Sequence, residues 1–185
     1  DMDFSGLGMI ANLYDLNQIE IFRGPQSSVY GANALAGLIS LKSNDPIGKS
    51  EIGISASKGS DNHLGINNYF NFKAIDGLNI RVSGSYNYID GFRENLSRNI
   101  SNTNKREEIF SRFKLKFNSN KKLNFLATFI YSELDNGYDA WAPNNNSDFK
   151  TYSDDKGIDS QTSYGYSLRT NINGNYNLTF ITSFT

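Results

Sequence analysis

The chain has 185 residues, of which 38% are hydrophobic and 14% aromatic, and 18 basic against 19 acidic residues give a formal net charge of −1. A near-neutral chain without a basic stripe does not predict a nucleic-acid partner, and the absence of cysteine excludes disulfides and thiolate metal sites. No apolar run approaches the length of about 18 residues that indicates a transmembrane helix.

Residues 1–49 predict the C-terminal part of a small α+β domain made of short elements. In chain order these elements are a strand at 18–22, a helical turn with a serine cap at 27–35, a second strand at 37–42 and a linker at 44–48. Arg23-Gly24-Pro25 ends the first strand, because Pro25 fixes its own φ and lacks a backbone donor. Gly24 and Gly31 are expected to permit tight backbone geometry, and Gly37 a close approach of two backbones.

From residue 50 to residue 185, apolar residues alternate with polar ones, which places them on opposite faces of β-strands. Strands of about 8–12 residues have the length that a tilted membrane strand needs. Seven of them are predicted, paired in sequence and antiparallel: 50–58, 63–74, 78–90, 107–117, 123–133, 163–172 and 176–185. Residues 50–185 therefore predict the N-terminal part of a transmembrane β-barrel.

The connections between these strands differ in length in a regular way. Tight turns at 75–77, 118–122 and 173–175 should share one end of the sheet. The polar connections at 91–106 and 134–162 are long and should lie at the other end, as in outer-membrane barrels. A soluble β-sandwich also alternates, but sandwiches rarely keep such a rhythm of short and long connections.

The two faces of a membrane barrel should differ in polarity, with lipid outside and the lumen inside. Residues expected to face lipid are Phe70, Phe72, Ile80, Val82, Phe113, Leu115, Phe125, Phe129 and Leu168. Residues expected to face the lumen are Arg81, Arg112, Lys114 and Arg169. Aromatic residues at the strand ends should form interfacial girdles: Tyr69, Tyr86, Tyr88, Tyr131, Tyr164, Tyr166 and Tyr176.

The longest connection, 134–162, is the predicted ligand-binding segment, since loops of this length are usually functional or disordered. Tyr138 and Trp141 offer flat apolar faces and Asp139 offers an acceptor oxygen, a combination that suits a bulky ligand. Packing of these aromatics within the loop is the alternative. The aspartates of this segment match no defined calcium loop, so no metal site is predicted.

The residues of an active site are missing from the sequence. His63 is the only histidine, and no Ser/His pair of a hydrolase can be assembled from the sequence. Neither a nucleophile motif nor a Gly-rich phosphate loop is present, so we expect neither an enzyme nor a bound cofactor.

The segment 19–40 resembles the end of the plug domain of TonB-dependent outer-membrane receptors. Its shared features are a strand leading into Arg23-Gly24-Pro25, a small-residue segment with Tyr30-Gly31, and Ala36-Gly37 before a second strand. Ser28 and Val29 occupy positions where many members of the family have Thr and Leu. These signature residues are expected to specify the plug fold, and Arg23 to pair with carboxylates of the barrel wall.

The resemblance implies a fragment of a receptor in the bacterial outer membrane, with a plug inside a barrel of about 22 strands. It implies uptake of a scarce, bulky nutrient, for which a ferric siderophore or a similar iron complex is expected. It also implies two partners besides lipid: a small-molecule ligand, and the TonB complex acting through a missing N-terminal segment. A passive porin lacks such a plug motif, whereas an adhesin or phage-receptor role stays open as an alternative.

Overall fold

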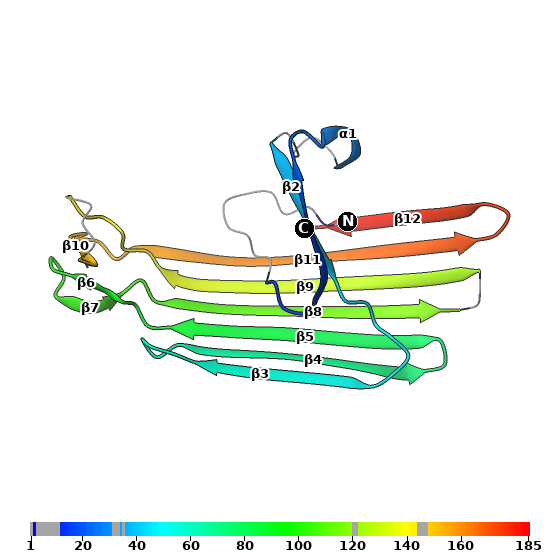
Figure 1. The fold of residues 1–185 in the computed structure, drawn as a ribbon, viewed down its shortest axis with the longest axis horizontal. Helices are drawn as coiled ribbons and strands as arrows, with labels where there is room; N and C mark the ends of the chain where they lie inside the picture. Colours follow the sequence, from blue (N-terminus) through cyan, green and yellow to red (C-terminus); the bar gives the residue numbers. More distant parts are fainter. Residues whose placement is uncertain (1, 3–11, 31–33, 35, 120–121, 144–147) are drawn as a thin grey trace.

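The computed structural model describes residues 2, 12–30, 34, 36–119, 122–143 and 148–185. Within them, a seven-stranded antiparallel sheet has the order β12-β11-β9-β8-β5-β4-β3, so its strands follow one another along the chain (Figure 1). The strands are β3 (Glu51–Lys58), β4 (Leu64–Ile75), β5 (Leu78–Ile89), β8 (Arg106–Asn118), β9 (Leu123–Gly137), β11 (Ile158–Asn173) and β12 (Asn177–Phe184). The predicted mainly β fold class and the order of the strands are confirmed.

Two strands are longer than their apolar pattern predicts. The pairing of β9 with β11 continues as far as Gly137 opposite Ile158, well beyond the last predicted strand residues. The backbone ladder continues here through polar residues, because main-chain hydrogen bonds do not depend on the apolar period. The connection between these strands is therefore 138–157, shorter than the predicted 134–162.

The short turns lie at one end of the sheet and the long connections at the other, as predicted (Figure 1). At the turn end, Asn118 N donates to Gly77 O at 2.8 Å, and Asn173 N donates to Lys122 O at 2.7 Å. At the loop end, Asp90 N donates to Asp61 O and Gly137 N to Lys105 O, each at 2.8 Å. Residues 120–121 of the predicted turn lie outside the described residues.

The register places the predicted lipid-facing side chains together on one face, here called the outer face. Phe70 lies opposite Val82, Val82 opposite Phe113, and Phe113 opposite Phe129. Phe72, Ile80, Leu115, Phe125 and Leu168 share this face through the same registers. The face also carries Tyr86, Tyr88, Tyr131, Tyr164 and Tyr166 of the predicted girdle.

The opposite face, here called the inner face, is polar and buried. Arg81, Arg112 and Lys114 are each at most 6% exposed, whereas Phe113 and Phe129 on the outer face are 39% and 44% exposed. Arg169 lies on the inner face as well, in register with Leu126. A polar interior with an apolar exterior reverses the pattern of a water-soluble protein and disfavours the soluble sandwich.

The N-terminal segment forms a hairpin of β1 (Leu16–Arg23) and β2 (Gly37–Ser43), with α1 (Ser27–Tyr30) between them. The hairpin runs across the direction of the large sheet (Figure 1). Gly24 has a φ of +84°, and a Cβ on Gly37 would lie 2.7 Å from Phe22 O, so both glycines are needed where they were predicted. Gly31 lies outside the described residues. No helix in the described part of the chain is long and apolar enough to span a membrane.

Candidate functional site: an anchored hairpin and a loop pocket

A buried ion pair fastens the N-terminal segment to the inner face of the sheet. Arg81 on β5 donates from Nε to Asp15 Oδ2 at 2.8 Å and from Nη2 to Asp15 Oδ1 at 2.5 Å. The side chains of Arg81 and Asp15 are 6% and 2% exposed. Burial alone would raise the pKa of Asp15. The hydrogen bonds from Arg81 and Asn44 together outweigh this effect, so the pKa of the carboxyl lies below its usual value.

Two further contacts join the N-terminal segment to the same face. Lys114 on β8 donates from Nζ to Asp45 Oδ1 at 2.5 Å and to Ser43 Oγ at 3.1 Å. Arg112, also on β8, donates from Nη1 to Tyr14 O at 3.3 Å. The open end of the hairpin, where the start of β1 meets the end of β2, is therefore held by two cations of β8 beside the Arg81 contact on β5.

The linker between hairpin and sheet is held by a single amide side chain. Asn71 on β4 is 2% exposed. Its Oδ1 accepts from Ile47 N at 3.0 Å, and its Nδ2 donates to Ile47 O at 2.9 Å. The Asn71 side chain thus bonds both the backbone N–H and the backbone C=O of Ile47, as a residue of a neighbouring strand would. These two bonds fix the path of the linker along the sheet.

The ion pairs between the N-terminal segment and the sheet do not include the predicted Arg23 pair. The sequence predicted that Arg23 of the hairpin pairs with carboxylates of the barrel wall. Among the described residues the wall supplies the cations and the N-terminal segment the carboxylates, while Arg23 is exposed and no ion pair involves it. Of the other signature residues, Pro25 and Tyr30 are also exposed, and the Tyr30 ring packs against Phe22 with centroids 5.4 Å apart.

One predicted girdle residue belongs to this anchor instead. Tyr69 lies on the inner face, opposite Ser83, and the Arg81 guanidinium lies over its ring at 4.3 Å. The prediction of Tyr69 as an interfacial residue was wrong, because alternation along β4 puts Tyr69 on the face opposite Phe70. The aromatic ring instead makes a cation–π contact with the buried guanidinium.

The two long connections at the loop end join each other through a second small sheet. It consists of β6 (Arg93–Asn95) and β7 (Ile100–Thr103) from one connection and β10 (Lys150–Thr151) from the other. Glu94 N donates to Phe149 O and Leu96 N to Thr151 O, each at 3.0 Å. The sequence did not predict these strands, since each has at most four residues and no apolar period.

Asp139 is at the centre of this loop assembly. It is 3% exposed, and its Oδ2 accepts from Asn95 Nδ2 and from Thr151 Oγ1, each at 2.8 Å. The same Asn95 amide donates to Ser153 O at 2.9 Å. Burial acts to raise the pKa of Asp139, but the hydrogen bonds from Asn95 and Thr151 lower it more, so the carboxylate stays charged inside the loops.

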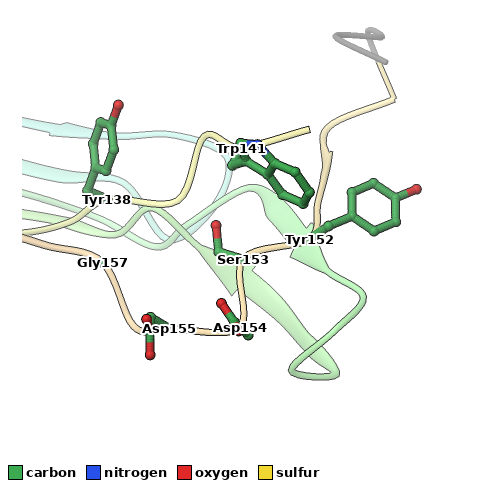
Figure 2. A pocket seen from close by; sticks show the side chains of 7 residues that line it. All are labelled: Tyr138, Trp141, Tyr152, Ser153, Asp154, Asp155 and Gly157. Atoms are coloured by element: carbon green, nitrogen blue, oxygen red, sulfur yellow. The ribbon is translucent and has the colours of Figure 1, made fainter. Parts of the chain in front are cut away.

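A pocket of about 370 Å³ opens on the surface of this assembly (Figure 2). Tyr138, Trp141 and Tyr152 supply its aromatic lining. Asp154 and Asp155 line it from the segment that follows β10. The Trp141 and Tyr152 rings meet edge to face with centroids 6.4 Å apart. Tyr138 and Trp141 are 64% and 58% exposed, so both retain free apolar surface that a ligand can cover.

The three predicted ligand-binding residues thus take two different positions. Tyr138 and Trp141 line the pocket, as a ligand contact requires. Asp139 lies beneath them with its carboxylate turned to Asn95 and Thr151. Tyr152, Asp154 and Asp155 also line the pocket but were not among the predicted ligand contacts. They lie more than ten residues further along the chain than Trp141, and backbone hydrogen bonds from Tyr152 N to Trp141 O and from Tyr138 N to Gly157 O, each 3.1 Å, bring the two parts of the connection together.

Replacing Asp139 with Ala should loosen the pocket without unfolding the sheet. The change removes the acceptor that Asn95 and Thr151 share. The Asn95 amide keeps Ser153 O, and the Thr151 hydroxyl is left with Glu94 O at 3.5 Å. A buried donor that loses its partner costs about 1–3 kcal/mol. We expect faster hydrogen exchange of the backbone amides of 93–103 and 150–153 in the full-length protein, with unchanged exchange in β4 and β5. Asp159→Ala, at an exposed aspartate just after this connection, is the control. Equal exchange in wild type and Asp139→Ala would show that Asp139 does not hold the loops.

Other polar candidates do not form a site. His63 accepts or donates a hydrogen bond at 3.1 Å between Nε2 and Asn87 Oδ1, next to the start of β4. Among the described residues, no group of three or more His, Asp or Glu side chains is placed to hold a metal ion. The loop pocket and the anchored hairpin are therefore the features from which function has to be inferred.

No protein-family model matches the chain. Solved structures do match it. The siderophore receptor PiuA from Acinetobacter baumannii aligns with 92% of the chain at 16% identity and a TM-score of 0.73, and the ferric yersiniabactin uptake receptor FyuA from Yersinia pestis with 91% at 17% and 0.76. The ferripyoverdine receptor of the outer membrane of Pseudomonas aeruginosa, bound to ferripyoverdine, aligns with 86% at 13% and 0.62.

The chain has the fold of a TonB-dependent outer-membrane receptor. The fold implied by the resemblance of residues 19–40 is thereby confirmed, with a plug-like hairpin followed by antiparallel barrel strands. The chain spans about a quarter of the length of these receptors: 26% of PiuA, 28% of FyuA and 22% of the ferripyoverdine receptor.

Proposed function

We propose that this chain is part of a TonB-dependent receptor that takes up a bulky nutrient across the bacterial outer membrane, with a ferric siderophore or a similar iron complex as the cargo. The observation that carries the proposal is the hairpin fastened to the polar inner face of a sheet whose outer face is apolar. The fold shared with siderophore uptake receptors supports the same cargo class.

In this proposal residues 1–49 belong to the plug and residues 50–185 to the barrel. The plug residues Asp15 and Asp45 bind the wall cations Arg81 and Lys114, which keeps the lumen closed at rest. The edge strands β3 and β12 each have one side without a partner among the described residues. Because an open strand edge is not stable in lipid, further strands of a longer receptor complete the barrel.

A passive porin fits these contacts poorly, because the hairpin lies across the face that would have to line an open channel (Figure 1). Transport therefore requires that the hairpin moves, and movement against several buried hydrogen bonds requires energy. The TonB complex is the proposed source of this energy. No bond of the cargo is made or broken by such a cycle.

Uptake of iron-labelled chelates by cells that produce the full-length receptor tests this function. Accumulation should depend on the receptor and should stop when TonB is deleted, while binding at the cell surface persists. Accumulation that is equal with and without TonB would instead show a passive channel. Surface binding without any accumulation would leave an adhesin or phage-receptor role.

Replacing Tyr138 and Trp141 together with Ala should weaken binding of the cargo by roughly ten- to a hundredfold. Each aromatic contact contributes about 0.5–1.5 kcal/mol to the binding free energy in addition to the free energy gained from burying apolar area. Both rings have exposed surface in the pocket that the cargo can cover. Titration of the full-length receptor with the chelate found in the uptake assay measures the effect. Phe149→Ala, an exposed aromatic on the same connection that does not line the pocket, serves as the control. Unchanged affinity with normal receptor levels would remove these residues from the capture site.

A further inference from the structure

The loop pocket combines aromatic surface with negative charge. Asp154 and Asp155 line it beside Tyr138, Trp141 and Tyr152, and no Lys or Arg is among its lining residues. The side chains of Asp154 and Asp155 lie on the segment opposite Trp141 (Figure 2). One segment of the connection therefore supplies Tyr138 and Trp141 to the pocket, and the other supplies both carboxylates together with Tyr152.

A third carboxylate lies beneath this lining. Asp139 is buried next to Tyr138, and its Oδ2 partners, Asn95 and Thr151, are both neutral. Hydrogen bonds from neutral groups hold the charge in place but do not cancel it. The whole 138–157 connection contains four aspartates and two lysines, so its net charge is negative as well.

Negative charge at this position discriminates between classes of iron chelate. Many ferric chelates are anionic, and such a ligand would be repelled by carboxylates a few ångströms away. An ammonium group, in contrast, gains both from the carboxylates and from the face of an aromatic ring. Three cations, Arg81, Arg112 and Lys114, lie buried on the inner face of the sheet. Lys150 and Lys156 belong to the same connection as the pocket but are not among the residues that line it.

We propose that this pocket selects metal chelates that carry a cationic ammonium group over neutral or anionic chelates. The proposal rests on the uptake function proposed above and names the charge class of its cargo. Trp141 and Tyr138 contact the apolar part of the chelate, and Asp154 and Asp155 pair with the ammonium group. Asp139 is a positioning residue, because it holds the two connections together without lining the pocket.

A matched pair of probes isolates the charge. A linear ferric trihydroxamate with a free terminal amine is compared with the same chelate after acetylation of that amine, which removes the positive charge and leaves the metal centre unchanged. The full-length receptor should bind the amine form roughly three- to tenfold more tightly, as expected for exposed ion pairs and cation–π contacts. This preference should shrink as salt is added, since salt screens exposed charges.

The variant Asp154→Asn/Asp155→Asn should lose most of the preference for the amine form, because the ion pairs are removed while the aromatic faces remain. Asp61→Asn is the matched control: Asp61 lies at the same end of the sheet in the β3–β4 turn with a φ of 53°, a conformation that Asn also adopts. It should keep the wild-type preference. Equal binding of both forms by the wild type, or an undiminished preference in the double variant, would overturn the proposal. If neither form binds while another iron chelate enters in a TonB-dependent way, the charge selection is wrong and the uptake function stands.

Discussion

Replacing Asp15 with Asn is expected to release the N-terminal hairpin from the barrel wall. Asn keeps the left-handed backbone conformation of residue 15, whose φ is 57°, so the change removes the charge without adding backbone strain. It leaves the Arg81 guanidinium buried without its bidentate partner, which costs about 3–5 kcal/mol for a buried pair. We expect the lower end, because Arg81 also approaches Glu51 at 3.6 Å and covers the ring of Tyr69.

Hydrogen exchange of the β1 and β2 amides in the full-length receptor measures this release. Asp15→Asn should accelerate exchange in the hairpin strongly and leave β5 and β8 protected. Glu20→Gln is an exposed change on β1, where the Glu20 side chain accepts a hydrogen bond from the nearby Gln18, and it should behave as wild type. Exchange in Asp15→Asn at the wild-type rate would show that the ion pair does not anchor the hairpin.

The same anchor should respond to acid in a defined direction. The pKa of Asp15 is lowered from 3.8 in the folded protein, so its carboxylate stabilises the docked hairpin at every pH above that value. As the pH falls below 3.8 and passes the lowered pKa, Asp15 becomes protonated and this stabilisation is lost. The rate of hydrogen exchange in β1 and β2 should then approach the rate in Asp15→Asn. In the variant this step should be absent.

Replacing Phe129 with Arg should destabilise the folded barrel by about 2–4 kcal/mol in the membrane. Phe129 lies on the outer face of β9 between Phe113 and Tyr166, in the central band of the sheet, and is 44% exposed. An arginine there faces hydrocarbon without a partner. Urea-induced unfolding of the full-length receptor in lipid vesicles gives the difference in free energy.

A second arginine variant tests whether depth in the membrane sets this cost. Ser160 shares the outer face with Phe129 but lies at the loop end, opposite Asp135. Ser160→Arg should cost about 0–1 kcal/mol, because positions near the interface tolerate charge. Equal costs at the two positions would contradict a lipid-facing outer surface, whatever their absolute size.

Much of the barrel followed from local patterns. The apolar period of 2 predicted the seven strands, and because each strand starts in the phase set by its turn, it also predicted which side chains share a face. The opposite faces of Phe113 and Lys114 need no tertiary information. The likeness of 19–40 to a plug signature predicted the hairpin for the same local reason, since Gly24 and Gly37 are required by its turn.

Interactions between distant segments could not be predicted in this way. The sequence contains 18 basic and 19 acidic residues, and nothing local marks Arg81 as the partner of Asp15, 66 positions away, rather than Arg23 as a partner of the wall. The same holds for the loop pocket: Asp139 was predicted as a ligand contact, but Asn95 and Thr151 draw it beneath the surface. Alternation along a strand is decided within a few residues, whereas ion pairs and loop cores depend on which strands the sheet brings together, and only the tertiary structure determines that.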